Sequence, residues 1–263
     1  ANNGADVINC SWGSFGATQF SQDIVRYATY NQDALLVGGA GNDNRENRFY
    51  PASYQEVVSV GASDWNDWKS DFSNYNYDID IIAPGTLIFS LKNDTYGYDS
   101  GTSMSAPIVA GAAGLVRNRF PELSAIQVME QLRVTADPSV YDVPQNAAFT
   151  DKLGSGRLDM FQAVDSISSP ALRVDYHEFT DGDDEVFVSG EYVNLGIELT
   201  NYLLPIEDVT VSITSTNPHV NVVDGVWQAG DLAQNGRLNN LITPFQLEIL
   251  AVDSHDVQVD VKV

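Results

Sequence analysis

The chain has 263 residues, of which 43% are apolar, enough to bury the core of one medium-sized domain and a smaller one. Its formal net charge is −23 and its pI is near 4.1. A surface this acidic repels phosphate backbones and argues against nucleic acid as a partner. No apolar run approaches the roughly 20 residues that cross a membrane, so no membrane span is expected. Cys10 is the single cysteine, which excludes an internal disulfide, and its apolar neighbours predict burial.

The first part of the chain, residues 1–168, is predicted to be an α/β domain. Short buried strands are expected at 7–10, 34–37, 57–60 and 79–82, and helices at 23–31, 103–120, 124–134 and 160–166. Strands that alternate with helices in this way are typical of a parallel sheet covered on both faces.

The second part, residues 171–263, follows a linker at 166–170 and alternates apolar and polar residues with period two. This alternation is clearest at 193–199, 209–213 and 257–263, and Gly- or Pro-containing turns separate the runs. We therefore predict a small antiparallel β-sandwich domain. It carries 16 acidic and 3 basic residues, so the acidity is concentrated here.

Both ends of the chain are expected to fall inside longer elements. Residues 1–6 have the Asn and Gly typical of a helix C-cap, and Val263 ends an alternating strand. More polypeptide is therefore expected upstream of Ala1.

The segment Gly101-Thr102-Ser103-Met104-Ser105-Ala106-Pro107 opens a predicted helix of small apolar residues. A serine in the first turn of a helix has free N–H groups and the positive end of the helix dipole beside it. Pro107 fits near a helix start, where N–H groups have no intrahelical partner to lose. Ser103 is thus a candidate nucleophile and oxyanion donor. The alternative is that Gly-Thr-Ser only caps the helix.

Two further segments follow predicted strands. Gly39-Ala40-Gly41-Asn42 combines glycines, which allow close approach of another chain, with an amide that can donate to an oxyanion. Ser11-Trp12-Gly13 follows the strand at 7–10 and is suited to pairing with an extended peptide. Trp12 is either part of a pocket wall or part of the core.

Together these segments resemble the subtilases, the subtilisin-like serine peptidases, over residues 1–168. Ala5–Gly13 resembles the substrate-binding strand of that family, Gly39–Asn42 its oxyanion-hole segment and Gly101–Pro107 its catalytic serine segment. Framework segments also match, including Tyr50–Tyr54, Val57–Ala62, Phe72-Ser73, Ile82–Gly85 and Gly154–Asp159.

The resemblance implies a secreted endopeptidase, extracellular or at the cell surface, acting on protein or peptide substrates. It implies Ser103 as nucleophile and Asn42 as side-chain oxyanion donor. It implies that the extended substrate binds along Ser11, Trp12, Gly13, Gly39, Ala40 and Gly41. No cofactor is implied as required. A structural calcium or sodium ion is implied at carbonyls of Ala52, Tyr54 and Val57 with the carboxylate of Asp80, all hard oxygen ligands.

The histidine that such a serine needs is missing upstream of Ser103. His177, His219 and His255 all lie in the predicted β-domain, and Ile108 replaces a histidine that many members carry but that is not the base. The family places Asp and His before Ser, so both are expected in a missing N-terminal part of the same domain. The chain alone is not expected to be an efficient protease.

Two other interpretations are an α/β-hydrolase and a protein without catalytic activity. An α/β-hydrolase needs Gly-x-Ser-x-Gly, and Ser105 stands at the fifth position here. A non-catalytic pseudo-protease or binding scaffold stays open, because the upstream Asp and His decide it.

Overall fold

The computed structural model describes residues 1–92, 94–182, 186–215 and 217–251. The chain divides into two compact units, Ala1–Ile167 and Ser168–Val263. Each unit is described by itself. The described part of the chain contains no helix that is both long and apolar enough to cross a bilayer.

The first unit is built on a four-stranded parallel sheet in the order β1-β2-β3-β4, which confirms the predicted α/β class. The strands are β1 (Val7–Cys10), β2 (Leu35–Gly39), β3 (Val57–Ser63) and β4 (Ile81–Pro84). β2 and β3 are buried along their whole length, as expected of strands covered on both faces. The fourth strand begins two residues later than the predicted 79–82.

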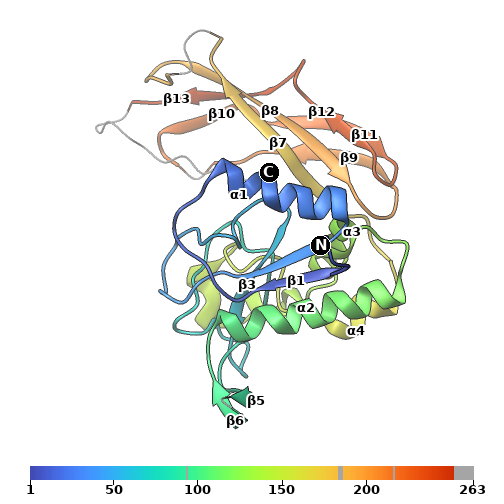
Figure 1. Ribbon diagram of the computed structural model, residues 1–263. Helices are drawn as coiled ribbons and strands as arrows, with labels where there is room; N and C mark the ends of the chain where they lie inside the picture. Colours follow the sequence, from blue (N-terminus) through green and yellow to red (C-terminus); the bar gives the residue numbers. More distant parts are fainter. Residues whose placement is uncertain (93, 183–185, 216, 252–263) are drawn as a thin grey trace. The chain divides into compact units, whose positions relative to one another are not determined.

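Helices cover both faces of this sheet (Figure 1). α2 (Thr102–Arg119) packs along β1, β2 and β3, and α3 (Ala125–Val134) and α4 (Met160–Asp165) pack against α2. On the other face, Val25 and Ala28 form a cluster with Leu36 and Val57. Val25 belongs to α1 (Gln19–Arg26), and Ala28 belongs to the π-helical turn Tyr27–Asn31 that follows it. The predicted helix at 23–31 starts too late, because Thr18 caps the helix by accepting the N–H of Ser21.

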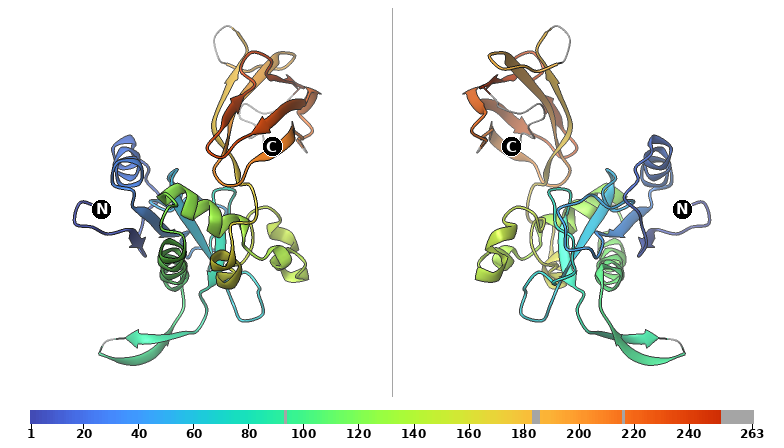
Figure 2. Two further views of the ribbon diagram at one scale, coloured as in Figure 1. Left: turned by 90° about the vertical axis from the view of Figure 1, so that its right-hand side faces the viewer. Right: turned by 90° about the vertical axis from the view of Figure 1, so that its left-hand side faces the viewer.

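Short elements complete the first unit. An antiparallel hairpin, β5 (Ile88–Lys92) and β6 (Thr95–Asp99), projects from the body of the unit (Figure 2). Two 3-10 turns lie at Pro138–Tyr141 and Pro144–Phe149. Residues 2–4 form a turn in which the N–H of Gly4 donates to the carbonyl of Ala1.

In the second unit, the described residues form antiparallel sheets. One sheet runs β10-β13-β8-β12, with β7 also paired to β8, and β9 pairs with β11 in the other. The bounds are β7 (Leu172–Thr180), β8 (Tyr192–Asn201), β9 (Ile206–Ser212), β10 (Val220–Asp224), β11 (Val226–Leu232), β12 (Arg237–Asn239) and β13 (Phe245–Ile249). Apolar side chains of both sheets share one buried cluster, including Ile197 and Val211. The predicted strand at 257–263 lies outside the described residues, and sandwich packing stays a prediction.

Candidate active site

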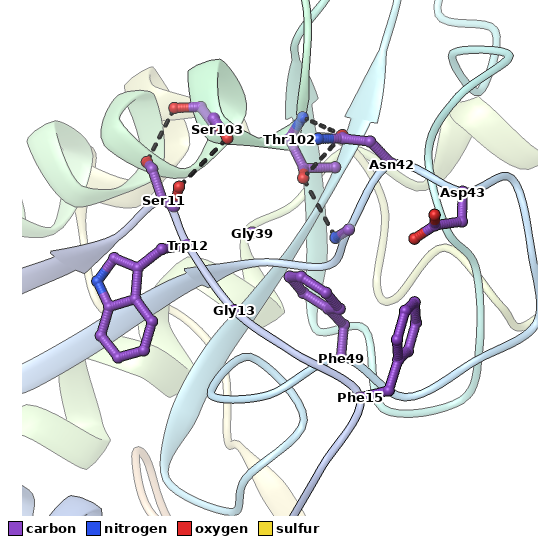
Figure 3. A pocket seen from close by; sticks show the side chains of 11 residues that line it. Ser11, Trp12, Gly13, Phe15, Gly39, Asn42, Asp43, Phe49, Thr102 and Ser103 are labelled. Atoms are coloured by element: carbon purple, nitrogen blue, oxygen red, sulfur yellow. Dashed lines mark hydrogen bonds between the residues drawn. The ribbon is translucent and has the colours of Figure 1, made fainter.

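A cavity of about 370 Å³ opens where β1 and β2 end and α2 begins (Figure 3). In a parallel sheet these carboxyl ends share one edge, where ligands bind in open α/β folds. The lining residues come from four separate parts of the sequence: Ser11, Trp12, Gly13, Phe15, Gly39, Gly41, Asn42, Asp43, Phe49, Thr102 and Ser103. The three segments singled out in the sequence therefore meet in one place.

Ser103 lies in the first turn of α2, with its side chain at the cavity. Its hydroxyl donates a long hydrogen bond of 3.4 Å to the carbonyl of Ser11, and the Ser11 hydroxyl donates to the Ser103 carbonyl at 2.9 Å. These two bonds join the end of β1 to the start of α2. A first-turn N–H has no intrahelical acceptor, so the N–H of Ser103 is available to a ligand in the cavity.

Asn42 is oriented by Thr102. The Asn42 Oδ1 atom accepts from the Thr102 N–H at 2.9 Å and from the Thr102 hydroxyl at 3.1 Å. The Thr102 hydroxyl oxygen accepts the buried N–H of Gly41 at 3.2 Å. Because the amide oxygen is occupied, the amide NH₂ is left as the donor that faces a ligand. Within the described residues, Asn42 Nδ2 donates to no other group.

The loop that carries Asn42 is held in place by the buried side-chain amide of Asn74. Asn74 is 0% exposed and donates to the carbonyl of Ala40 at 3.0 Å. Its Oδ1 accepts the N–H groups of Asp43 at 2.9 Å and Arg45 at 3.3 Å. A side chain at Gly41, whose φ is +101°, would collide with this amide. Asn74 therefore fixes the backbone on both sides of Asn42.

Lys69 also stabilises this loop, at Asn44, two residues after Asn42. Its Nζ donates to Asn44 Oδ1 and to the carbonyls of Ser70 and Ser73, each at 2.9 Å. The ammonium also lies over the Phe149 ring, 4.8 Å from the centroid. Desolvation in this buried position lowers the pKa of Lys69 to about 8, against a smaller opposing effect of Asp71.

The structure brings five of the six predicted peptide-binding residues to the cavity. Ala40 is the sixth and does not line it: its side chain is 1% exposed and packs against core residues such as Ile79 and Ile82. Its N–H donates to the Val60 carbonyl at 2.9 Å. Trp12 is 68% exposed, so it belongs to the cavity wall and not to the core.

Three lining residues went unrecognised in the sequence: Phe15, Phe49 and Asp43. Phe49 reaches the cavity because Ser14 and Tyr50 exchange two backbone hydrogen bonds of 2.8 Å, which lay residues 49–50 beside residues 13–15. No local pattern signals that pairing. The position of Asp43 at the cavity could have been predicted from the sequence, because it directly follows Asn42.

No histidine of the described ranges lines the cavity. The first unit has no histidine in its sequence, and His177 and His219 have their contacts within the second unit. The former packs edge-on against Phe179, and the latter bonds to the carbonyl of Ala251 through Nδ1 at 2.8 Å. His255 lies outside the described residues. Among the described residues, the site holds the Ser103 hydroxyl and two N–H donors, the Ser103 backbone and the Asn42 amide, but no histidine.

The predicted cation ligands are partly engaged by the protein itself. Asp80 Oδ2 accepts the N–H of Ser59 at 2.9 Å, and the carbonyl of Tyr54 accepts the N–H of Val57 at 3.3 Å. Among the described residues no three His, Cys, Asp or Glu side chains cluster as metal ligands would.

Comparison with known proteins identifies the class. The model of the subtilase family, Peptidase S8, matches residues 1–162, which is more than half of the chain. The chain therefore belongs to the subtilase family of serine proteases.

Its curated relatives are bacterial proteases. A thermophilic serine proteinase of Bacillus sp. (strain AK1) is 38% identical over 138 residues, covering 52% of this chain and 34% of the relative. Subtilisin BL of Lederbergia lenta is 39% identical over 136 residues, covering 51% of this chain and 50% of the relative. The chain thus spans between a third and a half of the length of these relatives.

Solved structures give the same answer for the fold. The prenylagaramide maturation protease PagA superposes with a TM-score of 0.56 at 30% identity, covering 62% of each chain. A protease of Pseudoalteromonas arctica superposes with a TM-score of 0.54 at 30% identity, covering 62% of this chain and 52% of that one. The matched share corresponds in size to the first unit.

Proposed function

We propose that this chain carries the nucleophile and the oxyanion hole of a serine endopeptidase. Ser103 Oγ attacks the carbonyl carbon of a peptide bond, and the N–H of Ser103 and the amide of Asn42 donate to the oxyanion that forms. Collapse of this intermediate breaks the C–N bond and leaves an acyl group on Ser103, which water then removes. The observation that supports this most is that both donors and the hydroxyl line one cavity, with Asn42 oriented by Thr102.

The base is proposed to come from polypeptide outside these 263 residues. A histidine takes the proton of Ser103 and passes it to the leaving amine, and an aspartate orients that histidine. In a subtilisin, a member of the same family, loss of the histidine costs about 10⁶ in turnover. The chain alone is therefore expected to be almost inactive.

Extended peptides are proposed to bind between the ends of β1 and β2. Gly13 is exposed and has no side chain to cover its backbone, whereas Gly39 is buried and a Cβ there would lie 3.0 Å from the Thr102 carbonyl. A peptide laid along Ser11–Gly13 would pair by main-chain hydrogen bonds.

A fluorophosphonate probe tests the proposal. In the full-length parent it should modify Ser103 and no other serine, with Ser103→Ala as the unlabelled control. The chain of 263 residues should label far more slowly. A parent that contains the upstream histidine and aspartate, yet neither labels nor cleaves peptides, would favour the scaffold reading instead.

Three further properties belong to the same proposal. The second unit is a non-catalytic β-sandwich. The parent protein acts outside the cell or at its surface, where a net charge of −23 favours solubility in a saline medium. A weak calcium or sodium site uses Asp80 with the carbonyls of Ala52, Tyr54 and Val57, a set of hard oxygen ligands. Raising CaCl₂ against EDTA should then raise the Tm of the chain but not of Asp80→Asn.

A further inference from the structure

A buried lysine without an ion-pair partner contacts the loop that carries Asn42. Lys69 is 7% exposed, and within the described residues it forms no ion pair. Its Nζ donates instead to three neutral oxygens, Asn44 Oδ1 and the carbonyls of Ser70 and Ser73, each at 2.9 Å. Burying an ammonium without a counter-charge costs free energy. A methionine would fill similar space without that cost, so packing alone does not account for the charge.

The acceptors of Lys69 belong to two adjacent segments, the oxyanion loop (residues 41–45) and residues 70–75. Main-chain hydrogen bonds already join these segments, one of them from the Asn44 N–H to the Phe72 carbonyl at 2.8 Å. The ammonium adds bonds to both sides, and it therefore cross-links the loop to the segment beside it.

The cross-link depends on the protonation of Lys69. A lysine ammonium has three N–H donors, and the three bonds use all of them. A neutral amine has two N–H donors and a lone pair, so after loss of the proton one of the three oxygens has no donor. Desolvation lowers the pKa of Lys69 to about 8, which places this change just above neutral pH.

The charged and titratable groups on the segments around Lys69 do not reverse this effect of burial. They are Asp43, Arg45 and Glu46 on and after the oxyanion loop, Asp67, Asp71 and Tyr75 near Lys69 in sequence, and Asp151 and Lys152 after the turn that ends at Phe149. Lys152 is paired with Glu46 at 2.7 Å, and Asp67 is paired with Arg157 at 2.6 Å. Attraction by Asp71 raises the pKa of Lys69, but by less than burial lowers it.

We propose that protonated Lys69 is a positioning residue of the oxyanion hole, which holds the oxyanion loop so that the amide of Asn42 faces the developing oxyanion. This assignment rests on the proposed function and adds to it a residue outside the cavity. Lys69 acts through Asn44 and the segment 70–75. Oxyanion donors work only in a fixed geometry, and a displacement of about 1 Å can lower turnover about 10²-fold. Loss of the proton should therefore lower kcat more than it changes KM.

Stability and turnover should change in opposite directions above pH 8. The folded-state pKa of Lys69 lies below that of an unfolded lysine, so the free energy of unfolding rises with pH between the two values. Over the same interval the cross-link beside Asn42 loses a donor, so kcat should fall while the fold becomes more stable. Inactivation by unfolding would instead lower both together.

Initial rates of the full-length parent on a peptide amide, measured from pH 6 to 10, provide the first test. In wild type, kcat should fall about tenfold or more above pH 8, with KM changed by less than about twofold. Lys69→Met should have the lower kcat throughout and lack this alkaline decrease. Lys92→Met, on the exposed hairpin, is the matched control and should keep the wild-type profile.

Asn44→Asp tests the charge of Lys69 without removing the lysine. It places a carboxylate where Asn44 Oδ1 accepts from Nζ, and aspartate, like asparagine, adopts the left-handed backbone of this position (φ 52°). The carboxylate stabilises the ammonium, so the alkaline decrease in kcat should move to higher pH by about one unit or more. A lysine that only fills space would show no such movement.

NMR on the 263-residue chain gives a measurement that does not depend on catalysis. The ¹³C-detected carbonyl signals of Gly41 and Asn42 should titrate with the same midpoint as the Cε signal of Lys69. This titration should be absent from Lys69→Met and shifted to higher pH in Asn44→Asp. If Lys69→Met fails to fold, Asn44→Asp alone decides both measurements.

The outcomes distinguish this assignment from the proposed function. An alkaline decrease that stays in place in Asn44→Asp, wild-type kcat in Lys69→Met, or Asn42 signals that do not follow Lys69 would each overturn the positioning role and leave the endopeptidase proposal standing. A parent with the upstream histidine and aspartate that fails to label at Ser103 would overturn the endopeptidase proposal and, with it, this role in an oxyanion hole.

Discussion

Asn42 and Thr102 are joined through a single oxygen atom: the Thr102 N–H and hydroxyl both donate to Asn42 Oδ1, at 2.9 and 3.1 Å. The pairing matters because it leaves only the NH₂ side of the amide for a ligand. It also ties the loop after β2 to the start of α2, which carry the two proposed oxyanion donors.

Replacing Thr102 with valine removes the hydroxyl bond of this pair at almost constant volume, while the backbone N–H can still donate to Asn42 Oδ1. The buried N–H of Gly41 then loses its acceptor, and such a loss costs about 1–3 kcal/mol. Urea unfolding of the full chain should show a free energy of unfolding reduced by that amount. Thr95→Val, on the exposed hairpin, is the matched control and should stay within about 0.5 kcal/mol of wild type. Equal effects of the two variants would argue against the link.

Replacing Asn42 with alanine should act on turnover more than on stability. Loss of one oxyanion donor lowers kcat by about 10²–10³, a magnitude taken from a subtilisin, a member of this family. The measurement is kcat of the full-length parent on a peptide amide. Asn118→Ala, on the exposed surface of α2, should keep wild-type kcat. Retention of full kcat by Asn42→Ala would remove Asn42 from the oxyanion hole.

Lys69 should give stability an unusual dependence on pH. Its folded-state pKa of about 8 lies below the value of about 10.4 for an unfolded lysine. Between these values the unfolded chain holds one more proton, so the free energy of unfolding should rise with pH there, by about 3 kcal/mol at most. Below pH 8 both states are protonated and this contribution is constant.

The Lys69→Met variant isolates that contribution from other titrating groups. It should be less stable than wild type, since three acceptors lose their donor. Its free energy of unfolding, measured from pH 7.5 to 10.5, should lack the rise seen in wild type. Parallel curves for the two proteins would mean that Lys69 has an ordinary pKa.

Alanine at Gly85, which packs against Ser105 of α2, and alanine at Gly111, within α2, should change the free energy of unfolding in opposite directions. A Cβ at Gly85 would lie 2.6 Å from that of Ala62 and would collide with Ser105 Oγ, so Gly85→Ala should cost about 1–3 kcal/mol. A Cβ at Gly111 meets nothing within 4 Å, so Gly111→Ala should add about 0.5–1 kcal/mol through helix propensity. Thermal unfolding of the full chain measures both, and equal signs would contradict the packing described here.

The sequence is most informative where function depends on residues next to the end of an element. Ser103 begins a helix, and Asn42 and Ser11 each follow a strand, so local pattern alone predicts that they meet at one sheet edge. Phe49 and Asn74 reach the site through contacts across 30 or more residues of sequence, which no local pattern encodes. The hairpin at 88–99 was also missed, because its strands are largely exposed and Ile88-Phe89 breaks the alternation of apolar residues.

The position of Ser103 on α2 also determines when the site is lost on unfolding. The helix that begins beside Ser103 continues for 18 residues, and Ala106, Val109, Ala112 and Val116 on it are each 0% exposed. Amide hydrogens in the middle of such a helix exchange with solvent only when the whole unit opens. Ser103 opens that helix, and its two hydrogen bonds with Ser11 hold it to the end of β1, so we expect its position at the cavity to persist until the first unit unfolds as a whole.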